Sequence, residues 1–152
     1  MTKVLSLDGV NLDGRTVLVR VDINCPLSPE TNVFLDDTRI KMILPTLARL
    51  NKSKVVLLSH QSRPGKKDFT STLGHSRELG RVMGKNILWV DDIHGQKALD
   101  AISQMENGDI VMLNNVRMDE EEIGLKGDFI TLGKSKLVMA LSMIADAFVN
   151  DA

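Results

Sequence analysis

Polar side chains follow each short apolar segment of this sequence, and several of them are basic groups that could bind an anion. They are Asp22, Asn24, Ser59, His60, Arg63, Asp91, Asp92, Asn114, Asn115, Arg117, Asn150 and Asp151, and Arg39 stands at the start of an amphipathic segment. Guanidinium groups match the oxygens of carboxylates and phosphates, and such charge-assisted hydrogen bonds contribute about 1.5–3 kcal/mol each. If these side chains converge, the site they form suits a small polyanion.

Each of these residues taken alone also has a simpler structural interpretation. An isolated arginine after a strand is usually solvated or ion-paired, and His60 could be an ordinary turn residue. The stretch 91–95 (DDIHG) indicates a turn and a helix cap. Arg20 lies inside an apolar segment, where a structural ion-pair partner is expected. Only the convergence of several groups therefore supports a binding site.

Three further features favour structural interpretations over chemistry. The acidic run 119–122 is expected to be a solvated face, and Lys66 and Lys67 are expected to form a mobile loop tip. Cys25 has no histidine close to it in sequence, so an inert, packed thiol is expected rather than a nucleophile.

Neither of the common nucleotide-binding motifs fits this sequence. No G-x-G-x-x-G follows the first apolar segment, where DINCPL stands instead. The stretch 127–135 (GDFITLGKS) resembles a phosphate-binding P-loop, but it has five residues between its glycines instead of four and no strand before it. We interpret it as a chance resemblance.

Short segments rich in Val, Ile and Leu are the elements that must position the polar residues. They cover 16–21, 54–58, 86–90, 110–113 and 147–149. Continuous apolar runs of this length are typical of strands that are buried on both faces, as in a parallel sheet.

Segments with helical spacing lie between these strands, over 38–50, 74–83, 96–105 and 134–145. In the first of them Asp36 or Asp37 can cap the helix, and Pro45 predicts a bend. The alternation predicts an α/β fold, a Rossmann-like parallel sheet with helices on both faces. Ligands of such sheets bind outside the carboxyl ends of the strands, where the polar residues stand.

Two connections, 22–37 and 60–73, are longer than strand–helix loops usually are, and long loops in compact domains are often functional. The sequence around Val33 could add a small hairpin to the first of them.

Composition excludes several classes of protein. Of the 152 residues 43% are hydrophobic and 26% charged, and the net charge of −1 disfavours binding to nucleic acid or to an anionic membrane. The single cysteine allows no intrachain disulfide, which favours a reducing, cytoplasmic compartment. The first ten residues are too polar for a signal peptide, and no apolar run reaches the length of a membrane span.

Five segments, taken together, resemble the phosphoglycerate kinase family. They are VLVRVDINCPL at 17–27, DDTRI at 36–40, SHQSRPGKK at 59–67, NNVRM at 114–118 and ADAFVNDA at 145–152. The family's usual forms read VRVDFNVP, DDTRI, SHLGRP, ENVRF and VNDAFGTAHR, in the same order. The third segment resembles the archaeal branch. The resemblance covers nearly the whole chain.

The resemblance implies reversible phosphoryl transfer between ATP and 3-phosphoglycerate, giving 1,3-bisphosphoglycerate and ADP. It maps the substrate site onto Asp22, Ile23, Asn24, Arg39, His60, Gln61, Ser62, Arg63 and Arg117. Arg39 would be catalytic and contact the reacting carboxyl and the phosphoryl group in flight. His60, Arg63 and Arg117 would bind the remote 3-phosphate.

The resemblance also implies that the chain is one part of a larger enzyme. It stops at Ala152, where the family continues into FGTAHR. We therefore expect one α/β domain over 1–152, with Mg²⁺ and ATP or ADP bound by a C-terminal nucleotide domain that this chain lacks, and no activity in isolation. The alternatives are a non-catalytic anion-binding α/β module and, less favoured, a Rossmann-like regulatory domain.

Overall fold

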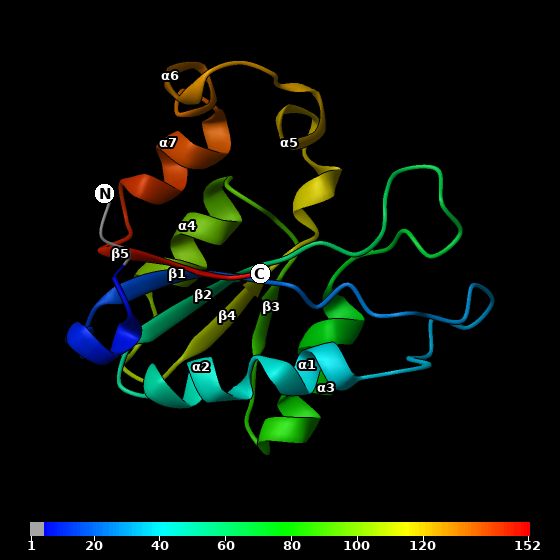
Figure 1. Ribbon diagram of the computed structural model, residues 1–152, viewed down its shortest axis with the longest axis horizontal. Helices are drawn as coiled ribbons and strands as arrows, with labels where there is room; N and C mark the ends of the chain where they lie inside the picture. The colour runs from blue at the N-terminus through cyan, green and yellow to red at the C-terminus, as the bar shows by residue number, and fades with distance from the viewer. Residues whose placement is uncertain (1–4) are drawn as a thin grey trace.

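A five-stranded parallel sheet forms the centre of the computed structural model, which describes residues 5–152 (Figure 1). Its strands are β1 (Thr16–Val21), β2 (Lys54–Leu58), β3 (Leu88–Val90), β4 (Ile110–Leu113) and β5 (Ala147–Asp151). They lie in the order β3-β4-β2-β1-β5, and every neighbouring pair is parallel. The prediction of a parallel, helix-covered sheet is confirmed.

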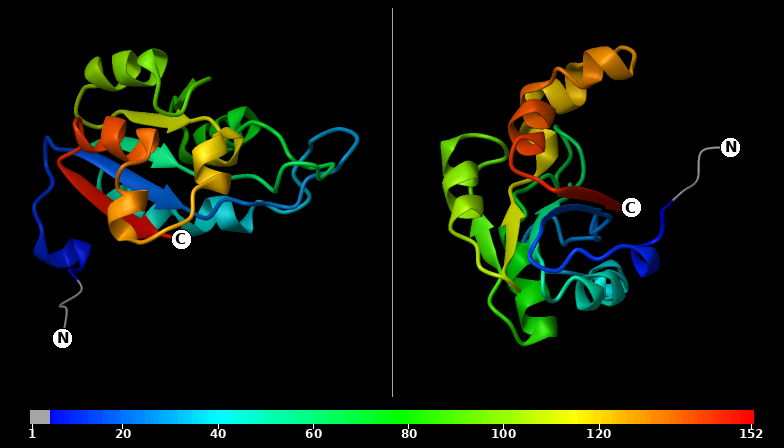
Figure 2. Two further views of the ribbon diagram at one scale, coloured as in Figure 1. Left: turned by 90° about the horizontal axis from the view of Figure 1, so that it is seen from above. Right: turned by 90° about the vertical axis from the view of Figure 1, so that its left-hand side faces the viewer.

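Helices cover both faces of the sheet (Figures 1 and 2). One face carries α1 (Thr38–Met42), α2 (Leu44–Arg49) and α3 (Leu73–Met83). The other carries α4 (Gln96–Ser103) and α7 (Lys136–Ser142), with α5 (Glu120–Gly124) and α6 (Phe129–Leu132) on the way to α7. Short 3₁₀ turns occur at η1 (Leu7–Gly9) and η2 (Val116–Met118). From β1 to β3 the chain crosses the sheet in one direction, and from β3 to β5 it returns in the opposite direction. Because crossovers between parallel strands are right-handed, the helices of the two halves lie on opposite faces of the sheet.

Alternate side chains of each central strand enter two separate cores. Val17 and Val19 of β1 pack with Ile40 and Leu79 on the side of α1 and α3. Leu18, which lies between them, packs on the opposite side in the core that contains Leu141. Full burial of such a side chain contributes about 1.5–3 kcal/mol. Apolar residues at successive positions of a strand therefore stabilise the packing of helices against both faces of the sheet.

Several element boundaries differ from the sequence prediction. The helix expected over 38–50 is two helices. Pro45 has no N–H to donate, and its ring clashes with the carbonyl four residues earlier, so the first helix ends before it. The chain continues as α2, with Pro45 in the first turn. The helices expected over 96–105 and 134–145 end at Ser103 and Ser142, and the strand expected from residue 86 begins at Leu88.

Two expectations about burial were wrong. The edge strand β5 is not buried on both faces, since the Phe148 residue is 60% exposed. Arg20 is exposed although it lies within β1, and it makes no ion pair with any residue between 5 and 152. Its side chain is therefore not the structural ion-pair partner that was expected.

The two long connections extend from the same end of the sheet (Figures 1 and 2). The first contains one antiparallel bridge between Leu27 and Phe34, with hydrogen bonds from Ser28 N–H to Val33 O and from Leu35 N–H to Pro26 O. The small hairpin expected around Val33 is thus present.

Candidate functional site

The strand order places most of the expected site residues at the ends of the three central strands. Asp22 and Asn24 follow β1, His60 and Arg63 follow β2, and Arg117 follows β4, and these strands are neighbours. The residues that follow β3 and β5 lie at the two edges of the sheet. The sequence predicted that the residues after all five strands would come together. In the structure only those that follow β1, β2 and β4 do so.

A cavity of about 450 Å³ opens among these central strand ends. It is lined by Asn24, His60, Ser62, Arg63, Lys66, Asp68 and Arg117. Three cationic side chains face one carboxylate, so the cavity carries net positive charge and suits a small anion.

Ser62 connects the three segments that form this cavity. Its N–H donates to Asn24 Oδ1 (2.8 Å), its Oγ donates to Asp68 Oδ1 (2.6 Å) and its carbonyl accepts from Arg117 Nη1 (2.6 Å). The backbone φ of Ser62 is 59°, in the left-handed region, which costs a non-glycine residue about 1 kcal/mol or more. These hydrogen bonds hold the strained turn and fix one end of the Arg117 guanidinium.

His60 is half-buried at the wall of the cavity. Burial lowers the pKa of its imidazole, and the positive charge of Arg117 lowers it further. Both effects favour the neutral form of His60, and an anion placed between His60 and Arg117 would favour its protonation.

Arg39 and Asp22 form an ion pair beside the cavity. Partial burial raises the pKa of Asp22, but the Asn24 N–H and the Arg39 guanidinium outweigh it and hold that pKa below its usual value. Arg39 does not pair with the acidic residues at the start of its own helix, since Asp36 accepts the Thr38 N–H (2.6 Å) and Asp37 pairs with Lys41 (2.7 Å).

Two residues of the expected substrate set are buried beneath the cavity. Ile23 and Gln61 are 1% and 0% exposed, and neither residue lines the cavity. Gln61 Nε2 donates to the carbonyl of Cys25 (3.0 Å) and weakly to that of Asp68 (3.5 Å), which ties the two long connections together. These side chains support the two connections, and contact of either residue with the substrate stays a prediction.

Asn115 and His75 complete this support. Asn115 is fully buried and its Nδ2 donates to the carbonyls of Gln61 and Thr70, both at 2.8 Å. His75 Nε2 lies 2.9 Å from Gln61 Oε1, and its ring meets Phe34 edge-on with 4.9 Å between centroids. Sequence reasoning missed His75, because nothing local in an amphipathic helix shows that its histidine faces a buried amide.

Further residues of interest have structural roles. Asp92 accepts N–H groups from Ile93, Gly95 and Ala98, which confirms the turn and helix cap expected there. Burial raises the pKa of the Cys25 thiol to about 11, which agrees with an unreactive group. The stretch 127–135 forms a capped turn and α6 instead of a strand, a loop and a helix.

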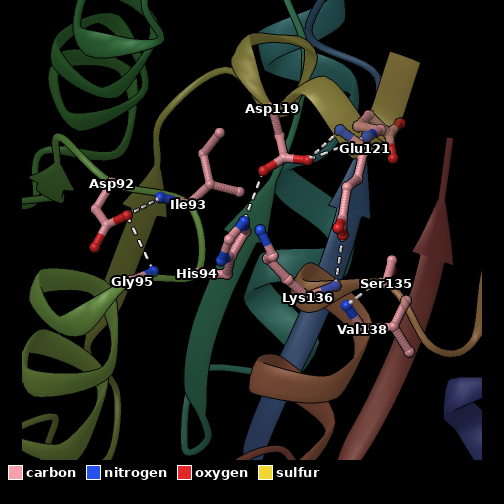
Figure 3. Close-up of polar contacts among 10 residues, drawn as sticks. Asp92, Ile93, His94, Gly95, Asp119, Glu121, Ser135, Lys136 and Val138 are labelled. Atoms are coloured by element: carbon pink, nitrogen blue, oxygen red, sulfur yellow. Dashed lines mark hydrogen bonds and ion pairs between the residues drawn. The ribbon is translucent and has the colours of Figure 1, made fainter. Parts of the chain in front are cut away.

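Asp119 is not part of a solvated face, as had been expected for the run 119–122. It lies half-buried and accepts from His94 Nε2 at 2.6 Å and from the N–H groups of Glu121 and Glu122 (Figure 3). Partial burial raises the pKa of Asp119, but the contact with His94 and the N–H groups lower it overall. Glu121 in turn accepts the Lys136 N–H (2.7 Å) at the start of α7 (Figure 3). The network joins the segment after Arg117 to the loop after β3.

No group of three or more His, Cys, Asp or Glu side chains within 5–152 is arranged to hold a metal ion. In the same part of the chain, no helix has the length and apolar character needed to cross a membrane.

Comparison with known proteins gives consistent matches. A family model described as phosphoglycerate kinase matches residues 7–152. The phosphoglycerate kinases of Methanobacterium bryantii and Methanocorpusculum labreanum are 44% identical over 149 residues and 45% identical over 148 residues. In both cases the match covers 97% of this chain and 36% of the relative.

Solved structures agree. The crystal structure of phosphoglycerate kinase from Pyrococcus horikoshii OT3 matches with a TM-score of 0.91 at 34% identity, over 98% of this chain and 36% of that one. The phosphoglycerate kinase structure from Coxiella burnetii gives 0.70 at 26% identity, over 97% and 35%. The chain spans just over a third of the length of the relatives that it matches.

Proposed function

Because this chain belongs to the phosphoglycerate kinase family, we propose that it supplies the phosphoglycerate-binding half of a longer kinase. The observation that carries the proposal is the cationic cavity beside the Arg39–Asp22 pair, on adjoining strand ends. A substrate with a phosphate at one end and a carboxylate at the other needs two such anion sites side by side.

Within this site we assign the phosphate to the cavity and the carboxylate to Arg39. His60, Arg63 and Arg117 bind the 3-phosphate, while Asp22 and Asn24 orient the hydroxyl and carboxyl end. In the reaction, a carboxylate oxygen attacks the γ-phosphorus of ATP, a new P–O bond forms, and the bond to the β–γ bridging oxygen breaks to release ADP. Little covalent help is required, so positioning and neutralisation of charge supply the catalysis.

The family uses Mg-ATP, and the strand-end residues of this chain do not fit the metal. Their donors are mainly arginine N–H groups, whereas Mg²⁺ requires oxygen ligands. We propose that Mg²⁺ and ATP or ADP are bound by a C-terminal domain of the parent chain. We further propose a cytoplasmic location, which the lone, buried cysteine favours.

Binding of 3-phosphoglycerate to the chain tests the phosphate assignment. Arg63→Ala or Arg117→Ala should weaken binding roughly 10-fold or more, since each removes a charge-assisted contact, and affinity should fall as salt rises. The matched control is Arg81→Ala, because Arg81 lies on α3 and pairs with Glu78 at 2.6 Å. Titration calorimetry at two salt concentrations measures the effect, and equal losses in all three variants would contradict the assignment.

The isolated chain should not convert 3-phosphoglycerate and ATP to products, because catalysis by positioning requires both substrates in one frame. A coupled assay of the purified 152-residue chain tests this. Turnover that persists in a contaminant-free sample and disappears in Arg39→Ala would show that no further domain is needed.

The runner-up function is an anion-binding module without catalysis. The same cavity supports it, and it differs in what the parent gene encodes after residue 152. A following nucleotide domain favours the kinase, whereas a stop codon favours the module.

A further inference from the structure

We infer that Lys66 is an additional phosphate ligand, which a tight turn holds beside Arg63 at the mouth of the cavity. The inference rests on the proposed function and extends it to a residue outside the expected substrate set. The sequence alone had favoured a mobile loop tip for Lys66, but its side chain lines the cavity together with Arg63 and Arg117.

The geometry begins with the four residues Arg63-Pro64-Gly65-Lys66. The Lys66 N–H donates to the carbonyl of Arg63 (3.1 Å), which closes a β-turn. Pro64 fixes a negative φ at the second position, and Gly65 has a φ of 85° at the third. Only the type II turn combines these two values.

A β-turn brings its first and last residues to the same place. The Cα atoms of positions i and i+3 lie within about 7 Å of one another, so Arg63 and Lys66 leave the turn as neighbours. Both residues line the cavity, and so does Arg117. A guanidinium fork and a flexible ammonium group can therefore bind different oxygens of one phosphate.

Lys67 provides the contrast. A second turn follows directly, closed by the Phe69 N–H and the carbonyl of Lys66 (3.1 Å), and it places Lys67 at a central position. Lys67 is exposed and does not line the cavity. The two adjacent lysines thus have the same charge and differ in the direction that the turns give them.

The local charge also supports the inference. Asp68 lines the cavity, but its carboxylate accepts the Ser62 hydroxyl (2.6 Å) and opposes the arginines electrostatically. Lys66 offsets this negative charge, so the two arginines remain available to a dianionic phosphate. Without Lys66 the cavity would hold two cations and one anion.

The test measures binding of 3-phosphoglycerate to the chain and to two matched variants, Lys66→Ala and Lys67→Ala. Lys66→Ala should weaken binding roughly 3- to 10-fold and reduce its salt dependence, and Lys67→Ala should change the affinity less than about two-fold. Glycerol 3-phosphate, which keeps the phosphate, should show the same ratio between the variants. Glycerate, which lacks the phosphate, should show none.

Each outcome bears on one of the two proposals. If Arg63→Ala weakens binding and both lysine variants bind like the unchanged chain, the inference about Lys66 is wrong and the proposed function stands. If the unchanged chain does not bind 3-phosphoglycerate, the proposed function fails first. Equal losses in Lys66→Ala and Lys67→Ala would assign the effect to overall charge and overturn the inference. Because Lys66 is exposed, its truncation should leave the fold intact, and an amide NMR spectrum checks this.

Discussion

Replacement of Arg39 by alanine in the full-length parent kinase should lower kcat by roughly 10³-fold or more, with a much smaller change in KM for 3-phosphoglycerate. Arginines that stabilise phosphoryl transfer in other enzymes contribute roughly 10³–10⁵ in rate. Arg39 pairs with Asp22 outside the lining of the phosphate cavity, and the proposed function assigns it to the reacting end of the substrate. An interaction made mainly in the transition state is expected to act on kcat.

The Arg39–Asp22 pair sharpens this expectation. Arg39 and Asp22 have side chains that are 48% and 41% exposed, so the pair itself contributes little to stability. Asp22 holds the guanidinium over the strand ends and leaves part of it accessible, which suits a group that must meet charge as it develops. Stability should therefore change little in Arg39→Ala, and this separates a catalytic loss from a folding defect.

Two comparisons complete the experiment. Arg39→Lys should recover only part of the rate, because a point charge cannot replace the planar fork. Arg63→Ala and Arg117→Ala should act mainly on KM, since the role proposed for these residues is to bind a phosphate that does not react. A kcat near that of the unchanged enzyme in Arg39→Ala would leave Arg39 with only its ion pair to Asp22.

The sequence predicted the central part of the fold well because burial on both faces leaves a strong local signal. The runs at β1, β2 and β4 are mainly apolar and occupy the middle of the sheet. The run at β5 is apolar too, yet β5 is an edge strand with an exposed Phe148. Whether a strand has one neighbour or two depends on the rest of the chain, so composition cannot separate the two cases.

The candidate site shows the same division between local and long-range information. The residues that converge at the cavity follow strand ends, and a parallel sheet brings such ends together. The support beneath them depends on pairs far apart in sequence, such as Gln61 with Cys25 and Asn115 with Thr70. The resemblance placed Gln61 in the substrate set by its position in a motif, and a motif does not show that the side chain is buried.

Lys66 marks the limit of what a motif can predict. The letters R-P-G-K suit a tight turn, because proline and glycine fit its two central positions, but the sequence analysis expected only a mobile loop tip there. The direction in which the turn faces follows only from the packing of the connection 60–73 against the sheet, where Ser62 and Gln61 anchor it.

Burial of His75 should make the folded chain less stable as the pH falls from about 6.5 to about 4. Burial lowers the pKa of His75 to about 4 from an ordinary value of 6.5. Between these values the unfolded chain binds more protons than the folded chain, so the free energy of unfolding rises with pH. Full stability is present above about pH 6.5, and about 3 kcal/mol is lost by pH 4, at 1.36 kcal/mol for each pH unit.

The hydrogen bonds around His75 explain why the charged form is disfavoured. Gln61 Nε2 donates to backbone carbonyls, so Gln61 Oε1 faces His75 and accepts its Nε2–H. His75 Nδ1 is buried and makes no hydrogen bond with any other residue that the structure describes. Protonation would place a positive charge in this buried site. The loss of water lowers the pKa of His75 more than the hydrogen bond with the Ile23 backbone raises it.

His75→Gln is the variant that isolates this titration, because the glutamine Nε2 can replace the imidazole Nε2–H as a donor to Gln61 and does not ionise in this range. Denaturant unfolding of both proteins at pH 7 and pH 4.5 gives the measurement, since the difference between the two pH values removes any constant cost of the substitution. The unchanged chain should lose about 2–3 kcal/mol more than the variant over this interval. His60 and the carboxylates with lowered pKa values, such as Asp22, act in the same direction in both proteins, so they cancel in the comparison.

Parallel pH profiles would show that His75 is not held neutral by the fold. A steeper profile for the unchanged chain, with acid weakening of 3-phosphoglycerate binding that His75→Gln reduces, would place this histidine among the groups that keep the phosphate cavity assembled.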